Sequence, residues 1–211
     1  MGKIVIYGTS IQQGGCASRT GMVPSAMIQR DFNLECVNIA TSGQARMDFY
    51  IAEAMASIED AICYVVDPVP NCTKDRCDTA TYDFIKILRT LRPEVPIVMV
   101  EGLMYPYTRH DSYHAEYLPQ KNECFRRGFD EHVAENPKGM YYMTHEGQTG
   151  PEMEGTVDGV HLTDYGFRAY ADLLEIHIKE ALDDTDVDYD VEPAYNVVRK
   201  KTFWERLKDL F

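Results

Sequence analysis

Three polar residues of this chain have the types and the spacing of a nucleophilic triad. Ser10 follows a short apolar run, residues 4–6, by a few positions, and far downstream Asp158 stands three residues before His161. A histidine can take the proton of a serine hydroxyl, and a neighbouring acid can fix the imidazole tautomer. This pattern predicts covalent catalysis, with Ser10 as nucleophile, His161 as base and Asp158 as the support of the base.

Each part of this pattern also has a structural explanation. A serine after a strand is a common N-cap of the next helix. Asp158 and His161 are also typical of a capping turn before a helix that begins near Thr163. We rank His161 above the histidines at positions 110, 114, 132, 145 and 177, because it combines a nearby acid with a helix start.

Acyl transfer further requires hydrogen-bond donors for the oxyanion that develops during attack. Gly43 follows the second expected strand and lets a backbone N–H approach a ligand closely. Asn71 follows the third and carries an amide donor. We expect both to line the site, and we expect a side chain at position 43 to crowd it. Taken singly, both are ordinary turn residues.

Apolar runs alternate with segments of helical period along the chain, and this alternation must position these groups. The expected strands are residues 3–7, 34–38, 61–67, 97–101 and 140–143, and the expected helices are residues 23–31, 47–58, 77–91, 117–135 and 163–182. Strand–helix alternation predicts a three-layer α/β/α sandwich around a five-stranded parallel sheet. Ser10 then lies at the carboxyl edge of the first strand, where such sheets bind ligands.

The 211 residues fit one domain with two appendages. We assign residues 1–183 to the domain, 184–201 to an acidic linker, and 202–211 to an amphipathic helix that docks on the domain or serves as a handle for a partner. The net charge of −13 argues against nucleic acid as a partner.

No apolar run is long enough to span a membrane. The first strand starts at Lys3, which leaves no room for a signal peptide and favours the cytoplasm unless the chain is a domain excised from a longer protein. The oligomeric state stays open.

The cysteine and histidine spacings predict no metal site. Cysteines stand at positions 16, 36, 63, 72, 77 and 124 without paired zinc-ligand spacing, and no His-x-x-x-His pair occurs. We expect free, mostly buried thiols, with a Cys72–Cys77 bridge as the alternative in an oxidising compartment. No cofactor is expected.

Four blocks of this sequence resemble those of the SGNH, or GDSL-type, hydrolases. They are the serine block 8–11, the glycine block 42–44, the asparagine block 67–71, and Asp158-x-x-His161. The resemblance extends from residue 3 to about residue 182. It implies a flavodoxin-like sheet and metal-free ester hydrolysis, with an oxyanion hole built from the Ser10 and Gly43 backbone N–H groups and the Asn71 amide.

Two positions depart from the usual family pattern. Thr9 and Cys72 stand where the family usually has acids. Both departures are similar to a branch whose serine block reads Gly-x-Ser-Ile and whose asparagine follows a proline. In that branch a β-sandwich domain often precedes the hydrolase unit, and this chain does not contain one.

The resemblance leaves the substrate open among acetylated carbohydrates, short acyl esters, lysophospholipids and thioesters. We expect small or water-soluble esters, with O-acetylated carbohydrate as one candidate, because no long apolar lid is evident. Tyr105 and Tyr107 could stack on a sugar and Arg109 could hold an anion, although loop packing is the favoured explanation for all three.

Two other functions compete with the hydrolase. A Thr/Ser-rich loop after the first strand could cradle the phosphate of a flavin or nucleotide, and the chain could be a catalytically silent relative. Gln12 excludes the Gly-x-Ser-x-Gly elbow of α/β-hydrolases, and no Lys-Ser/Thr follows the glycines as a P-loop requires.

Overall fold

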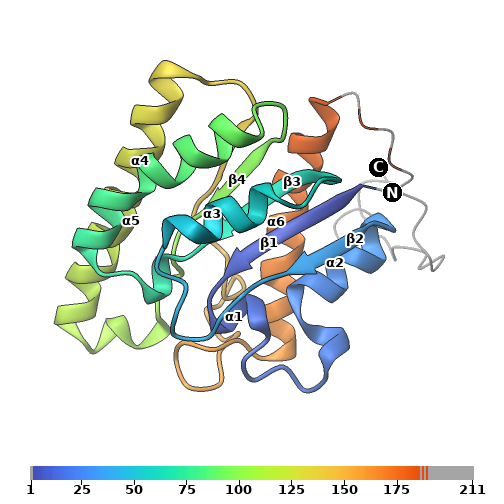
Figure 1. The fold of residues 1–211 in the computed structure, drawn as a ribbon. Helices are drawn as coiled ribbons and strands as arrows, with labels where there is room; N and C mark the ends of the chain where they lie inside the picture. Colours follow the sequence, from blue (N-terminus) through green and yellow to red (C-terminus); the bar gives the residue numbers. More distant parts are fainter. Residues whose placement is uncertain (1, 186, 188, 190–211) are drawn as a thin grey trace, which may run out of the picture.

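Five parallel strands form the central sheet of the computed structural model, which describes residues 2–185, 187 and 189 (Figure 1). Their order is β2-β1-β3-β4-β5. The strands are β1 (Lys3–Gly8), β2 (Glu35–Asn38), β3 (Ala61–Asp67), β4 (Ile97–Val100) and β5 (Met140–Met143). This is the flavodoxin-like order, so the predicted fold class is confirmed.

Helices cover both faces of the sheet (Figure 1). The α-helices are α1 (Ser10–Gln13), α2 (Pro24–Phe32), α3 (Phe49–Ala56), α4 (Lys74–Leu91), α5 (Ser112–Glu135) and α6 (Asp164–Asp183). Three short 3-10 turns lie at Thr20–Met22, Val69–Asn71 and Pro106–Arg109. One core cluster joins α2 and α6 to the sheet, and the other joins α3, α4 and α5 to the opposite face.

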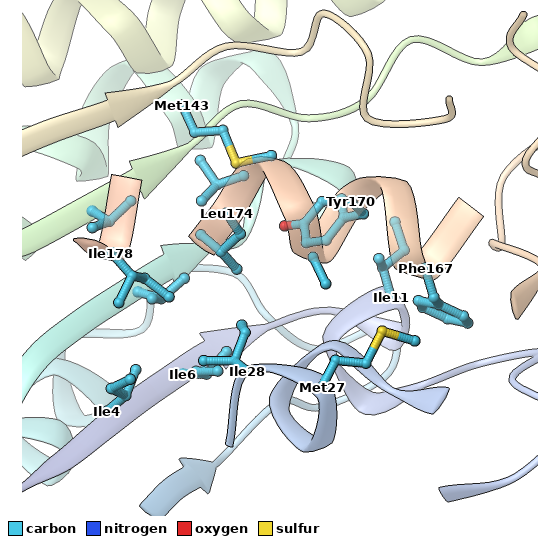
Figure 2. Close-up of a cluster of buried hydrophobic side chains, with 14 of the residues drawn as sticks. Ile4, Ile6, Ile11, Met27, Ile28, Met143, Phe167, Tyr170, Leu174 and Ile178 are labelled. Carbon is cyan, nitrogen blue, oxygen red and sulfur yellow. The ribbon is translucent and has the colours of Figure 1, made fainter. Parts of the chain in front are cut away.

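The last helix closes the core over the first strand. Figure 2 shows side chains of α6, among them Tyr170, Leu174 and Ile178, gathered with Ile4 and Ile6 of β1. All five side chains are at most 1% exposed. The two ends of the domain are therefore held together by apolar burial, which contributes about 1.5–3 kcal/mol for each large side chain.

The structure differs from the sequence-based elements mainly at helix starts. Helix α5 begins at Ser112 rather than at residue 117, because the Asp111 side chain caps it by accepting from the backbone N–H of His114 at 3.1 Å. Pro119 lies inside this helix. Likewise α4 begins at Lys74 because Thr73 caps it. The short helix α1 was not predicted.

The appendages fall largely outside the described residues. This holds for most of the acidic linker assigned to residues 184–201 and for all of the helix assigned to 202–211. Within the part that the structure does describe, none of the helices combines the length and the apolarity that a bilayer crossing requires.

The chain adds β2 on one side of β1 and then adds β3 on the other side. This switch in the order of the strands creates a crevice at the carboxyl ends of β1 and β3. Residues that follow β1 and β3 therefore start at this edge. The loop that precedes α6 returns to the same edge, because Phe167 and Tyr170 pack α6 against the sheet.

This last loop is tightly closed. An isolated bridge pairs Thr156 with Leu162, and the backbone N–H of Thr163 donates to the carbonyl oxygen of Gly155 at 2.9 Å. A Cβ atom at Gly166 would lie only 2.0 Å from that carbonyl oxygen, so α6 can approach the loop only with glycine at this position.

We expect Gly166→Ala to destabilise the fold by about 1–3 kcal/mol, because the added methyl group overpacks this contact. In an unobstructed helix the same change would stabilise by about 1 kcal/mol. Denaturant unfolding measures the effect. Gly21→Ala is the matched control, since its nearest atom would be a flexible arginine nitrogen at 3.7 Å. A Gly166→Ala protein as stable as the parent would contradict this prediction.

Candidate active site

A chain of hydrogen bonds links Ser10, His161 and Asp158. The Oγ atom of Ser10 lies 2.9 Å from Nε2 of His161, and the other ring nitrogen, Nδ1, lies 2.7 Å from Oδ2 of Asp158. Ser10 is the first residue of α1, directly beyond β1, whereas the other two side chains come from the loop before α6. The structure thus brings together three groups that the sequence places at opposite ends of the domain.

The environment of Asp158 determines its protonation state. Its Oδ1 atom accepts from the backbone N–H groups of His161 and Val160 at 2.7 and 2.9 Å. The hydrogen bond to the His161 side chain, followed by these two backbone donors, holds the pKa of Asp158 well below its usual range. An ionised carboxylate can only accept, so Nδ1 of His161 carries the proton and Nε2 can receive the proton of Ser10.

The turn that carries Ser10 is capped at both ends. Thr9 is the N-cap, and its side chain accepts from the backbone N–H of Ile11 at 3.3 Å. Gly14 ends the helix with a left-handed φ of +92°. The hydroxyl of Thr9 therefore performs a helix-capping role. The backbone N–H of Ser10, in the first turn, has no intrahelical acceptor.

A buried polar cluster of Asp67, Gln12 and Tyr170 holds the turn that carries Ser10. The Oδ2 atom of Asp67, at the end of β3, accepts from Nε2 of Gln12 at 3.1 Å and from the hydroxyl of Tyr170 at 2.8 Å. Gln12 also donates to the Tyr170 hydroxyl at 2.8 Å. These bonds join β3, α1 and α6 directly behind the nucleophile turn.

The expected oxyanion residues lie in neighbouring loops. Asn71 accepts from the backbone N–H of Ala45 through its Oδ1 atom at 3.3 Å, which orients the amide and leaves its NH₂ group available to donate. Ser42, in the glycine block, is held by Gln13 of α1, whose Oε1 atom accepts from the Ser42 backbone N–H at 3.0 Å. The glycine block and the nucleophile turn are therefore in direct contact.

The surroundings of Gly43 are open. A Cβ atom there would meet nothing within 4 Å, so no neighbouring group occupies that space. The backbone also favours glycine here, because its φ of +72° is left-handed. A substitution there would strain the turn, and its side chain would project into this open space.

The three candidate substrate residues have different environments. Tyr105 is only 8% exposed and belongs to the core, where its ring packs against Tyr107 with a centroid distance of 5.3 Å. Loop packing therefore explains Tyr105. Tyr107 lies against the triad loop, since a Cβ atom at Gly159 would be 2.5 Å from its ring. Arg109 is exposed and approaches the sulfur of Met153 at 3.9 Å.

Two features near the site were missed from the sequence. Gly15 lies against the triad: a Cβ atom there would be 3.2 Å from Cδ2 of His161 and 3.5 Å from Cβ of Ser10. The glycine pair at positions 14 and 15 was the available signal. The sequence also contains a second Asp-x-x-His, Asp111 and His114, whose side chains are 2.7 Å apart but which caps α5. The structure distinguishes the two pairs, because the hydroxyl of Ser10 is hydrogen-bonded to His161 and not to His114.

All six cysteines have free thiols, including Cys72 and Cys77, so the alternative of a bridge between these two is not present in this structure. Cys72 is buried, and its sulfur contacts the carbonyl oxygen of Ala45 at 3.7 Å.

Burial of Asp67 predicts a specific pH dependence of stability. Desolvation raises the pKa of Asp67 from 3.8 to about 7, against the opposing effect of its two hydrogen bonds. In that interval the folded state binds a proton that the unfolded state has lost, so the free energy of unfolding should decrease as pH rises from about 4 to about 7. We expect Asp67→Asn to flatten this slope in denaturant titrations across that range.

Burial also raises the pKa of Glu175 to about 7. This gives the free energy of unfolding a pH slope of the same sign in the parent and in Asp67→Asn. The contribution of Asp67 is therefore the difference in slope between these two proteins. An equal slope in the parent and in Asp67→Asn would show that Asp67 stays ionised in the fold.

Comparison with known proteins agrees with this architecture. The model of the GDSL-like lipase/acylhydrolase family matches residues 2–179. A solved structure from Bacteroides ovatus, described as that of a GDSL-like lipase, is 31% identical with a TM-score of 0.82, covering 87% of this chain and 54% of that one. The salicylyl-acyltransferase SsfX3 from a tetracycline biosynthetic pathway is 16% identical with a TM-score of 0.69, covering 85% and 54%.

A family two carbohydrate esterase from Clostridium thermocellum is 18% identical with a TM-score of 0.65, covering 87% of this chain and 65% of the esterase. No curated protein matches the chain. The chain spans about half the length of the first two of these structures. Because the family model covers nearly all of the described domain, this chain belongs to the GDSL-like lipase/acylhydrolase family.

Proposed function

We propose that this protein is a serine esterase that hydrolyses acyl esters through a covalent intermediate on Ser10. The observation that carries the proposal is the continuous hydrogen-bonded chain from Ser10 to His161 to Asp158, with contacts of 2.9 and 2.7 Å. It lies at the carboxyl edge of a parallel sheet, where ligands bind in this class of fold.

Acylation starts when Oγ of Ser10 attacks the ester carbonyl carbon and its proton passes to Nε2 of His161. The carbonyl oxygen becomes an oxyanion, for which the donors are the backbone N–H groups of Ser10 and Gly43 and the amide of Asn71. Asp158 stabilises the imidazolium that forms. Collapse of the tetrahedral intermediate breaks the ester bond, and the leaving alcohol takes the proton from His161.

Deacylation repeats these steps with water. His161 takes a proton from a water molecule that attacks the acyl carbon, and the second tetrahedral intermediate releases the acid and restores the Ser10 hydroxyl. The steps use side-chain and backbone groups of this chain together with water, and none needs a metal ion.

Small or water-soluble esters are the proposed substrates, with O-acetylated carbohydrate as the leading candidate. Side chains of His161 and Asp158 are 31% and 49% exposed, so the triad is open to solvent. Tyr107, beside the triad loop, offers a ring for stacking on a sugar. The fold is shared with a carbohydrate esterase that was solved with cellohexaose.

The alternative of a flavin or nucleotide phosphate site has weaker support. It needs the hydroxyl of Ser10 as a phosphate donor, yet that hydroxyl is bonded to His161. Nothing in that alternative accounts for the carboxylate that orients the imidazole. A catalytically silent relative is separated from an esterase by the activity assays below.

Ser10→Ala should reduce the hydrolysis of p-nitrophenyl acetate by a factor on the order of 10⁴ or more, because no other group can form the acyl-enzyme. An organophosphate should inactivate the parent, and mass spectrometry should locate the adduct on the Ser10 peptide. Ser42→Ala, which changes an exposed serine of the neighbouring loop, is the matched control. An active Ser10→Ala protein would refute the mechanism.

Asn71→Asp tests the oxyanion hole more sharply than an alanine variant. Aspartate keeps the oxygen that accepts from Ala45 but replaces the donating NH₂ group with a second acceptor. We expect kcat to fall by at least about 10²–10³-fold with the melting temperature nearly unchanged. Full kcat in this variant would remove Asn71 from the oxyanion hole.

A further inference from the structure

Folding places a thiol beside the two loop members of the triad. The Cys16 sulfur, a carboxylate oxygen of Asp158 and a ring nitrogen of His161 all lie within 4.8 Å of one another. All six cysteines lie in the part of the chain that the structure describes, and among them Cys16 alone is exposed. It follows α1, whereas the other two residues precede α6, so the sequence spacing gave no sign of this cluster.

These three ligands suit a particular class of metal ion. Zinc binds thiolate at about 2.3 Å and imidazole or carboxylate at about 2.0–2.2 Å, usually as a tetrahedron. Those bond lengths place the ligand atoms about 3.4–3.6 Å apart, so shifts on the order of 1 Å would close the cluster on an ion. Magnesium and calcium prefer oxygen ligands and gain little from a thiolate.

The loop that carries Cys16 is held against the triad at both ends. On one side the backbone N–H of Gly15 donates to the carbonyl oxygen of Ser10 at 2.7 Å. On the other side the backbone N–H of Ser18 donates to Asp164, in the first turn of α6, at 2.9 Å. Cys16 therefore stays close to Asp158 and His161.

We propose that Cys16, Asp158 and His161 form a binding site for Zn²⁺, and that zinc bound there switches the esterase off. The second half of this inference rests on the proposed function. Binding releases the thiol proton of Cys16 to solvent, and the open position of a three-ligand site is filled by water.

Either mode of imidazole binding stops the reaction. If zinc takes Nε2 of His161, the lone pair that receives the Ser10 proton is occupied. If zinc takes Nδ1, the proton of the neutral ring moves to Nε2, which can then no longer act as a base. Zinc also draws Asp158 away from its role beside the imidazole. The metal is therefore an inhibitor of a serine mechanism.

The first test is inhibition of the full chain by zinc chloride after chelator treatment, followed with p-nitrophenyl acetate. We expect inhibition that EDTA reverses. In Cys16→Ser the zinc concentration for half-inhibition should rise by at least about tenfold, since even outer contacts of metal sites contribute that much to affinity. Cys36→Ser, which changes a partly exposed thiol in β2, should be inhibited like the parent.

A second test does not depend on activity. Cobalt(II) bound to a thiolate gives a near-ultraviolet charge-transfer band, which should develop with the parent and with Ser10→Ala and be absent with Cys16→Ser. If the parent shows the cobalt band but does not hydrolyse esters, the result would support the metal site and count against the proposed function. Hydrolysis without the band or zinc inhibition would overturn the site and leave the esterase intact.

Two further outcomes would overturn the inference. One is a cobalt band that persists in Cys16→Ser, which would assign the metal to another thiol. The other is zinc-stimulated hydrolysis by Ser10→Ala, which would make zinc the catalyst rather than the inhibitor.

Discussion

The carboxylate of Asp67 joins the segments of the chain on which the candidate site depends. Through Gln12 it holds the helix that begins with Ser10, and through Tyr170 it holds the helix that follows His161. It also ends the strand that leads to Asn71. Because Asp67 is only 2% exposed, water cannot replace these partners, and leaving one of them unpaired costs about 1–3 kcal/mol. Asp67 therefore helps to fix the distance between Ser10 and His161, although its carboxyl group is hydrogen-bonded to neither of them.

The parts of the site that the sequence revealed are those with a local signature. An apolar run before Ser10 indicates a strand exit, and the spacing of Asp158 and His161 is visible within four residues. The alternation of strands and helices in the sequence predicted the three-layer arrangement, because parallel strands need crossover connections, which are usually helices. Helix starts were less accurate where caps such as Asp111 and Thr73 stand outside the apolar periodicity.

Contacts between distant segments could not be predicted in this way. Nothing near Gly15 or Cys16 in the sequence shows that they meet the loop before α6, because only the packing of α6 on the sheet brings that loop to this edge. Tyr105 illustrates a related limit. A tyrosine in a loop can pack inward or face a ligand, and its burial at 8% depends on neighbours from α5 and from its own loop.

The closure of the core by α6 has a consequence for how the protein is made. Ribosomes synthesise β1 first and α6 last among the described elements, yet Tyr170, Leu174 and Ile178 of α6 cover the same side of the sheet as Ile4 and Ile6 (Figure 2). Until α6 emerges, that apolar surface of the nascent chain lies open to water and to other chains. Domain completion must therefore wait for the end of α6, and the interval before it is when chaperones would bind.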